Sequence, residues 1–167
     1  MAGEAISMHP RTSATLDQLK GVAWFANVGR VDTDAADVLP DWVSAIASCS
    51  APEWEDLCLE AANQFRERLQ ERCPGILGDW NARVSAVKPT VESLVDEKTA
   101  AVIAENQLPP VFVNTVEWDV LHLCMEAEFA DVYPPGFYAS QAYWYAGGHF
   151  PCGWKGAFPN GGRLVIF

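Results

Sequence analysis

Aromatic side chains gather at the end of this sequence, and they constrain the fold more than any other feature. The segment from Tyr133 to Phe167 holds 10 of the 19 aromatic residues, including all four tyrosines. Each large ring removes roughly 150–250 Å² of surface from water when it is buried. We therefore expect residues 133–167 to close the hydrophobic core. The apolar end Leu164–Phe167 should be buried, because an exposed apolar strand edge promotes aggregation.

The chain length fits a single domain. A globular chain of 167 residues buries about 70% of its unfolded surface, and half of these residues are apolar. No linker-like stretch and no internal repeat divides the sequence. We expect one domain over residues 1–167, with residues 1–13 as a loose lead-in because they show no periodicity.

Helical spacing of apolar residues runs through most of the chain. Three pairs have the spacing of capping boxes: Thr15 with Gln18, Ser50 with Glu53, and Asn114 with Glu117. Glycines and prolines mark the stops, including a break at Pro89. The predicted helical segments are 16–28, 34–38, 40–48, 54–72, 76–87, 91–107 and 115–131.

The segment 115–131 is apolar on all sides, which is typical of a buried helix, and we predict it as the central helix of the fold. Residues 137–145 are compatible with either a helix or an aromatic strand, because a short apolar run does not distinguish them. Residues 159–162 read as the turn of an antiparallel hairpin whose return strand is 163–167. The expected fold class is therefore mainly α: a helical bundle with a small C-terminal β-hairpin.

Charge is strongly unbalanced, with a formal net charge of −11. Residues 31–65 carry eight acids and residues 99–154 carry six, and neither stretch contains a Lys or Arg. Such surfaces repel a phosphate backbone or an anionic membrane but attract a basic protein. The plainer interpretation is that acidity only keeps the protein soluble. The candidate partner-binding residues are Asp32, Asp34, Asp37, Asp41, Glu53, Glu55, Asp56, Glu117, Glu128 and Asp131.

The five cysteines are odd in number and form no C-x-x-C pair, which is typical of thiols in a reducing compartment. The N-terminus lacks a signal-peptide pattern, and no apolar run approaches the ~18 residues of a membrane span. We expect a cytoplasmic protein. The sequence gives no indication of its oligomeric state.

The predicted central helix and the tail each suggest a possible site. Glu117, Glu128 and Asp131 project to one side near Cys124, with Asp119 and Glu126 opposite, as in a paired-carboxylate site. The favoured alternative is that these acids reach the rim of the bundle or meet arginines. His149 and Cys152 suggest a thiol- or metal-dependent enzyme, with Cys152 as nucleophile and the Gly153 amide stabilising an oxyanion.

A zinc site would need two more ligands, and the nearest are His122 and Cys124. Positions i and i+2 on a helix diverge by about 200°, so both cannot point at one metal. We therefore expect no metal and no cofactor. Aromatic residues Tyr143, Trp144, Tyr145 and Trp154 suggest a further alternative, a groove that binds a peptide or sugar, against the plainer role of closing the core.

The tail from Ala142 to Ile166, with Gly148-His149-Phe150-Pro151-Cys152-Gly153-Trp154 at its centre, resembles the C-terminus of a group of small bacterial cytoplasmic proteins. That group is identified with immunity proteins of type VI or polymorphic toxin systems. The match covers about 25 residues and departs at Lys155, where an acid is common, and at Gly161-Gly162, where one glycine is usual. The resemblance implies a structural tail motif (His149, Pro151, Cys152, Gly153 and Trp154) and no catalytic residue.

These observations favour a non-enzymatic immunity protein. Its acidic segments would block the basic active site of a cognate toxin, plausibly a nuclease, because a basic cleft is what an acidic surface complements.

Overall fold

Helices make up most of the protein. The computed structural model describes residues 6–25, 36–50, 54–132, 136–156 and 161–167. Within these ranges the elements, in chain order, are α1 (Pro10–Lys20), β1 (Ala36–Val38), α2 (Trp42–Ser48), α3 (Trp54–Arg72), a 3-10 turn (Ile76–Gly78), α4 (Trp80–Asn106), α5 (Pro110–Glu128), α6 (Phe137–Ala146), β2 (Pro151–Lys155) and β3 (Arg163–Ile166). The mainly α class with a small C-terminal sheet is confirmed.

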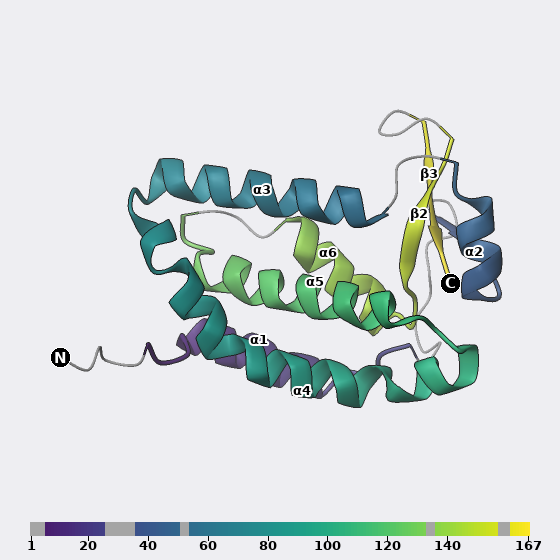
Figure 1. Cartoon of the computed structure of the whole chain (residues 1–167), viewed down its shortest axis with the longest axis horizontal. Coiled ribbons are helices and arrows are strands. Elements are labelled where there is room, and N and C mark those ends of the chain that lie inside the picture. Colours follow the sequence, from purple (N-terminus) through teal and green to yellow (C-terminus); the bar gives the residue numbers. More distant parts are fainter. Residues whose placement is uncertain (1–5, 26–35, 51–53, 133–135, 157–160) are drawn as a thin grey trace.

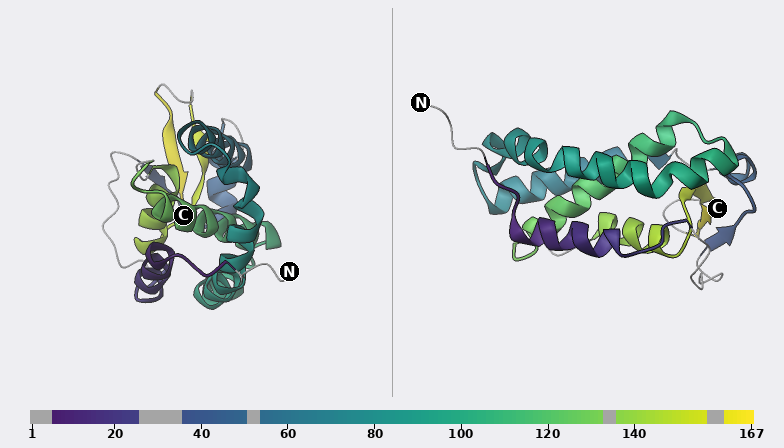
Figure 2. Two further views of the ribbon diagram at one scale, coloured as in Figure 1. Left: turned by 90° about the vertical axis from the view of Figure 1, so that its left-hand side faces the viewer. Right: turned by 90° about the horizontal axis from the view of Figure 1, so that it is seen from below.

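Helix α5 lies at the centre of the bundle (Figure 1), as its apolar sequence predicts. It packs against α1, α4 and α6, and more lightly against α3. The small sheet and α2 stand at one end of the bundle, and the views in Figure 2 show α1 and α4 running along the same side of α5. No helix in the described ranges is both long and apolar enough to cross a lipid bilayer.

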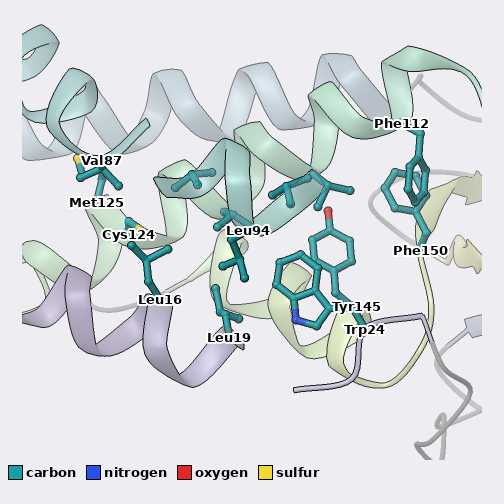
Figure 3. Packing of buried hydrophobic residues seen from close by; sticks show 14 of the residues in the cluster. Leu16, Leu19, Trp24, Val87, Leu94, Phe112, Cys124, Met125, Tyr145 and Phe150 are labelled. Atoms are coloured by element: carbon teal, nitrogen blue, oxygen red, sulfur yellow. The ribbon is translucent and has the colours of Figure 1, made fainter. Parts of the chain in front are cut away.

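The main core runs along the inner faces of these helices (Figure 3). Leu16 and Leu19 of α1 belong to it together with Cys124 and Met125 of α5, and the rings of Phe112, Tyr145 and Phe150 fill the end next to the sheet. The rings of Tyr145 and Phe150 are stacked with an interplanar angle of 9°. The aromatic tail therefore closes this core, as the sequence predicts.

Proline does not interrupt α4, and the predicted break at Pro89 is wrong. A proline inside a helix costs about 3 kcal/mol. Pro89 lies on the exposed side of the helix, while Val87, Val91 and Leu94 are buried and continue the inner face across it. Each buried side chain of this size contributes about 1.5–3 kcal/mol, so burial outweighs the cost and one helix forms where two were expected.

Two helices begin earlier than their predicted capping boxes, and both begin at a proline. Helix α1 starts at Pro10, with His9 as its N-cap, and ends at Lys20, so residues 10–13 are not a loose lead-in and the Thr15 box is wrong. Helix α5 starts at Pro110, so Asn114 lies inside it and its last helical residue is Glu128. Proline suits the first helical position because that residue has no intrahelical N–H bond to lose.

The helix predicted over 40–48 is present as α2, and Asp41 is its N-cap: the Asp41 carboxylate accepts hydrogen bonds from the Ser44 backbone N–H (2.8 Å) and hydroxyl (2.9 Å). Glu53, the partner of Ser50 in the remaining predicted capping box, lies outside the described residues. Helices α3 and α6 are present as helices, which settles the open assignment of 137–145.

The sheet has three strands in the order β1-β3-β2. Strands β2 and β3 form the predicted antiparallel hairpin, whose turn residues 159–160 lie outside the described ranges. Strand β1 pairs in parallel with β3, from Ala36 opposite Leu164 to Val38 opposite Ile166. The helical turn predicted over 34–38 is therefore wrong in its described part, because a nonlocal strand pairing determines the conformation of Ala36–Val38.

Helices cover both faces of this sheet. Leu164 and Ile166 form a second apolar cluster with Ala36, against which Phe137 and Trp144 of α6 pack. Val165 points to the opposite face and joins the main core with Ala45 of α2. The sheet is thus held between α6 and α2.

Candidate functional site

Two acids of α5 lie in the core and hold α6 in place. The buried carboxylate of Asp119 accepts a hydrogen bond from the hydroxyl of Tyr145. The buried carboxylate of Glu126 accepts one from the backbone N–H of Ala139 at 3.1 Å, in the first turn of α6. Burial raises the pKa of Glu126, and the backbone N–H groups at the start of α6 partly oppose this. These contacts give both acids a structural role.

Two other acids, Glu128 at the end of α5 and Asp131 just after it, meet arginines as the favoured interpretation predicts, whereas Asp119 and Glu126 lie in the core and not at the rim. Glu128 forms an ion pair with Arg83 of α4, and its side chain is only 5% exposed. Asp131, just after α5, pairs with Arg11 of α1 at 2.7 Å, where both side chains are exposed. The paired-carboxylate site therefore does not form, because each of these acids faces a different neighbour.

The histidine of α5 is part of an aromatic stack. The ring of His122 lies 4.4 Å from that of Trp118 and 4.8 Å from that of Tyr138, measured between centroids. Its Nδ1 atom is 2.9 Å from the carbonyl oxygen of Trp118. Burial lowers the pKa of His122 to about 4, so the ring is neutral at physiological pH.

The thiol of the tail is enclosed. Cys152 is 4% exposed, and burial is the main cause that raises its pKa far above the usual range. A thiol needs a lowered pKa to react as a nucleophile, so this environment argues against the thiol-dependent enzyme. Burial also lowers the pKa of His149, whose ring hydrogen-bonds the backbone of Phe167.

No group of three or more His, Cys, Asp or Glu side chains within the described ranges is arranged to hold a metal ion. His122 lies in its stack with Trp118 and Tyr138, whereas His149 lies beside Phe167. Cys124 is also buried, with a pKa raised to about 12.

The remaining tail residues have structural roles. A Cβ atom on Gly153 would lie 2.9 Å from the Sγ atom of Cys49, so only glycine allows the end of α2 to approach β2 this closely. The Trp154 carbonyl accepts a hydrogen bond from Ser50 N (2.8 Å), and Ser50 Oγ accepts one from Gly156 N (2.8 Å). Pro151, like Cys152 and Gly153, is buried.

The four rings proposed as an aromatic groove differ in their surroundings. Tyr145 is buried in the core, and Trp144 and Trp154 pack on the sheet cluster. Tyr143 is 62% exposed. Tyr145 thus has the role of closing the core, and Tyr143 is the ring that faces solvent.

The predicted partner-binding acids fall into several places. Asp32, Asp34 and Glu53 lie outside the described residues, as does the side chain of Glu55. Asp37 of β1 is bound by Arg163, with its Oδ1 atom 2.6 Å from Nε of that residue, and Asp41 caps α2. Asp56 is exposed on α3, and Glu117 is half-buried on α5.

Glu117 differs from the others because it faces further acids. Burial is the main cause that raises the pKa of Glu117, and the nearby carboxylates of Glu92 and Asp96 on α4 raise it further. Lys88 has a smaller effect that lowers it. Trp118, which follows Glu117, and Val111 are exposed on α5, two turns apart on the same side. We call these five residues, Glu92, Asp96, Val111, Glu117 and Trp118, the α4–α5 surface.

No family model, no curated protein and no solved structure matches this chain. Fold class alone does not determine function, so the function has to be argued from the site itself.

Sequence reasoning found Glu117 but missed its neighbours on the α4–α5 surface. Glu92 and Asp96 are four residues apart, which places both on one face of a helix, and this was the available signal. The nearby Lys88 and Lys98 mask it, because Glu92 and Asp96 lie outside the two stretches that contain acids but no Lys or Arg.

Proposed function

We propose that this protein is a non-enzymatic immunity protein that binds a basic bacterial toxin and blocks its active site in the cytoplasm. The observation that carries the proposal is the α4–α5 surface, where Glu92 and Asp96 of α4 lie near enough to Glu117 of α5 to raise its pKa, on a chain with a formal net charge of −11. Lys88 pairs with Glu92 at 3.6 Å and offsets part of this charge. Like charges held together create a local negative potential, which attracts a basic partner and speeds its association.

The exposed apolar residues support the same surface. Trp118 and Val111 are 37% and 40% exposed and lie on the same helix as Glu117. Protein interfaces commonly combine an aromatic anchor with surrounding charge, and Trp is the residue type most enriched among the anchors. Charge here would guide the encounter, and the apolar side chains would hold the complex.

A nuclease is the toxin class that fits this chemistry best. An enzyme that binds nucleic acid needs a cleft lined by Lys and Arg to neutralise phosphates. An acidic surface can occupy such a cleft in place of the nucleic acid. The resemblance of the tail to immunity proteins is independent of this charge argument and points in the same direction.

The test is a binding measurement with the toxin encoded by the adjacent gene. Isothermal titration at low and high salt should show a tight complex whose affinity falls at least about tenfold as salt screens the charges. Toxin activity should be lost at a 1:1 ratio. Absence of a complex, or an affinity that does not change with salt, would overturn the proposal.

A further inference from the structure

A cavity of about 480 Å³ lies at the sheet end of the bundle, and none of the residues of the α4–α5 surface lines it. Its wall comes from separate parts of the chain: the segment that follows α1, the end of β1 with the β1–α2 connection, the end of α4, the turn after α6 and the end of β3. The wall is mixed: polar atoms make up much of its exposed area, and six apolar residues line it, namely Phe25, Val38, Leu39, Pro40, Val102 and Phe167. A volume of this size, lined by apolar side chains together with a few polar groups, is typical of sites for small molecules.

The described part of the wall contains one carboxylate, that of Glu105. Glu105 and Asn106 line the cavity from α4, and no Lys or Arg is among the described residues that line it. Helix α4 ends here, since Gln107 has a left-handed backbone (φ 53°) that stops it. The C-terminus of a helix carries unpaired carbonyl groups and a partial negative charge, which favours a cation.

His149 contributes the second polar feature of the wall. The residue is 6% exposed, and its Nδ1 atom has no hydrogen-bond partner among the described residues. The backbone of Phe167 accepts a hydrogen bond from the ring. A neutral imidazole that donates through one nitrogen accepts through the other, so Nδ1 is suited to a ligand N–H group.

The backbone at Phe25 is strained beside this cavity. Its φ of 53° is uncommon for a bulky side chain. The surroundings hold it there: its N–H donates to the Tyr145 carbonyl at 3.2 Å, and its ring lies 5.5 Å from that of Phe112. Strain that the surroundings maintain in this way is commonly found at ligand sites.

We propose that this cavity binds a small primary amine with an apolar body. The apolar body lies against Phe25, Leu39 and Phe167, and the ammonium group lies beside the Glu105 carboxylate and the end of α4. An N–H of the same ammonium group donates to His149. The site is independent of toxin binding, so either proposal can fail without the other.

Phenethylamine and 3-phenylpropionate are suitable probes, because they share a phenyl ring and a two-carbon chain but carry opposite charges. Amide chemical shifts of the ¹⁵N-labelled chain, recorded during titration, report both affinity and location. Phenethylamine should bind saturably and shift residues 102–107 and 148–150. The acid should bind at least about tenfold more weakly. Equal binding of the two probes, shifts elsewhere, or no saturable binding of phenethylamine overturns the proposal.

Two variants locate the ammonium group and the ring. Glu105→Gln removes an exposed carboxylate and should weaken phenethylamine binding about threefold to fivefold at low salt, whereas Glu97→Gln, on the same helix but outside the cavity wall, should leave it unchanged. Leu39→Trp fills the cavity and should abolish binding, with circular dichroism confirming that the variant is folded. Unchanged binding in either Glu105→Gln or folded Leu39→Trp contradicts the assignment.

Discussion

The hydroxyl of Tyr145 donates a hydrogen bond to the carboxylate of Asp119 inside the core, and this contact joins α6 to α5. Figure 3 shows the hydroxyl pointing out of the aromatic group toward α5. A buried carboxylate needs such donors, because burying it without them is very costly. The contact therefore fixes the position of the C-terminal segment relative to the central helix.

Replacing Tyr145 with Phe should destabilise the protein by about 1–3 kcal/mol, because the buried Asp119 carboxylate loses this donor while the ring stays in place. Urea unfolding followed by circular dichroism measures the change. Tyr143→Phe is the matched control, since Tyr143 is exposed on the same helix and should change stability by less than about 0.5 kcal/mol. Equal stabilities of the two variants would show that the Asp119 contact does not contribute.

Glu126 should make the protein less stable as pH rises. Its pKa is raised from 4.5 by burial, so the folded state binds a proton more tightly than the unfolded state does. Its contribution is most favourable below the unfolded pKa and is lost as pH rises through the folded pKa. The free energy of unfolding of Glu126→Gln should therefore increase relative to that of the natural protein as pH rises. Urea unfolding across a pH series measures this difference. Ser140→Ala, an uncharged change on α6, should instead give a constant difference.

Gly153→Ala should destabilise the sheet, because the added Cβ meets Cys49 at 2.9 Å and φ is +151°. A side chain in this backbone region costs about 1–3 kcal/mol even without the clash. Thermal unfolding should show a lower midpoint for Gly153→Ala, with partial recovery in the double variant that also carries Cys49→Ala. Gly78→Ala has open space around it and should show no loss. A normal midpoint for Gly153→Ala would contradict the packing of α2 on β2.

Arg83→Met should cost about 3 kcal/mol, because it leaves Glu128 almost fully buried without its partner. Arg11→Met breaks the exposed pair with Asp131 and should cost less than about 1 kcal/mol. The comparison by urea unfolding separates a buried ion pair from an exposed one between the same kinds of residue. Similar losses in both variants would mean that burial of Glu128 does not determine the strength of its pair.

Features that depend on local sequence were predictable from it. The spacing of apolar residues predicts that α5 is buried on all sides and that residues 54–72 form a helix. The turn residues predict the hairpin of β2 and β3. Features that depend on distant contacts were not. Strand β1 exists because Ala36–Val38 pairs with β3, and α4 continues through Pro89 because its buried face continues.

The candidate sites show the same division. The charge imbalance and Glu117 are visible in the sequence, whereas the approach of Glu92 and Asp96 requires α4 to pack beside α5. The spacing of His149 and Cys152 suggested catalysis, and their burial in the closed core removes the thiolate chemistry that such a site requires.

The association rate constant with the toxin tests the α4–α5 surface most directly. Two triple variants change net charge equally: Glu92→Gln with Asp96→Asn and Glu117→Gln on the surface, and Glu60→Gln with Glu67→Gln and Glu71→Gln, all exposed on α3, as the control. At low salt the first should slow association about tenfold and the second less than about twofold, because steering depends on where the charge lies. Equal slowing by both variants, or no slowing by the first, would contradict the account.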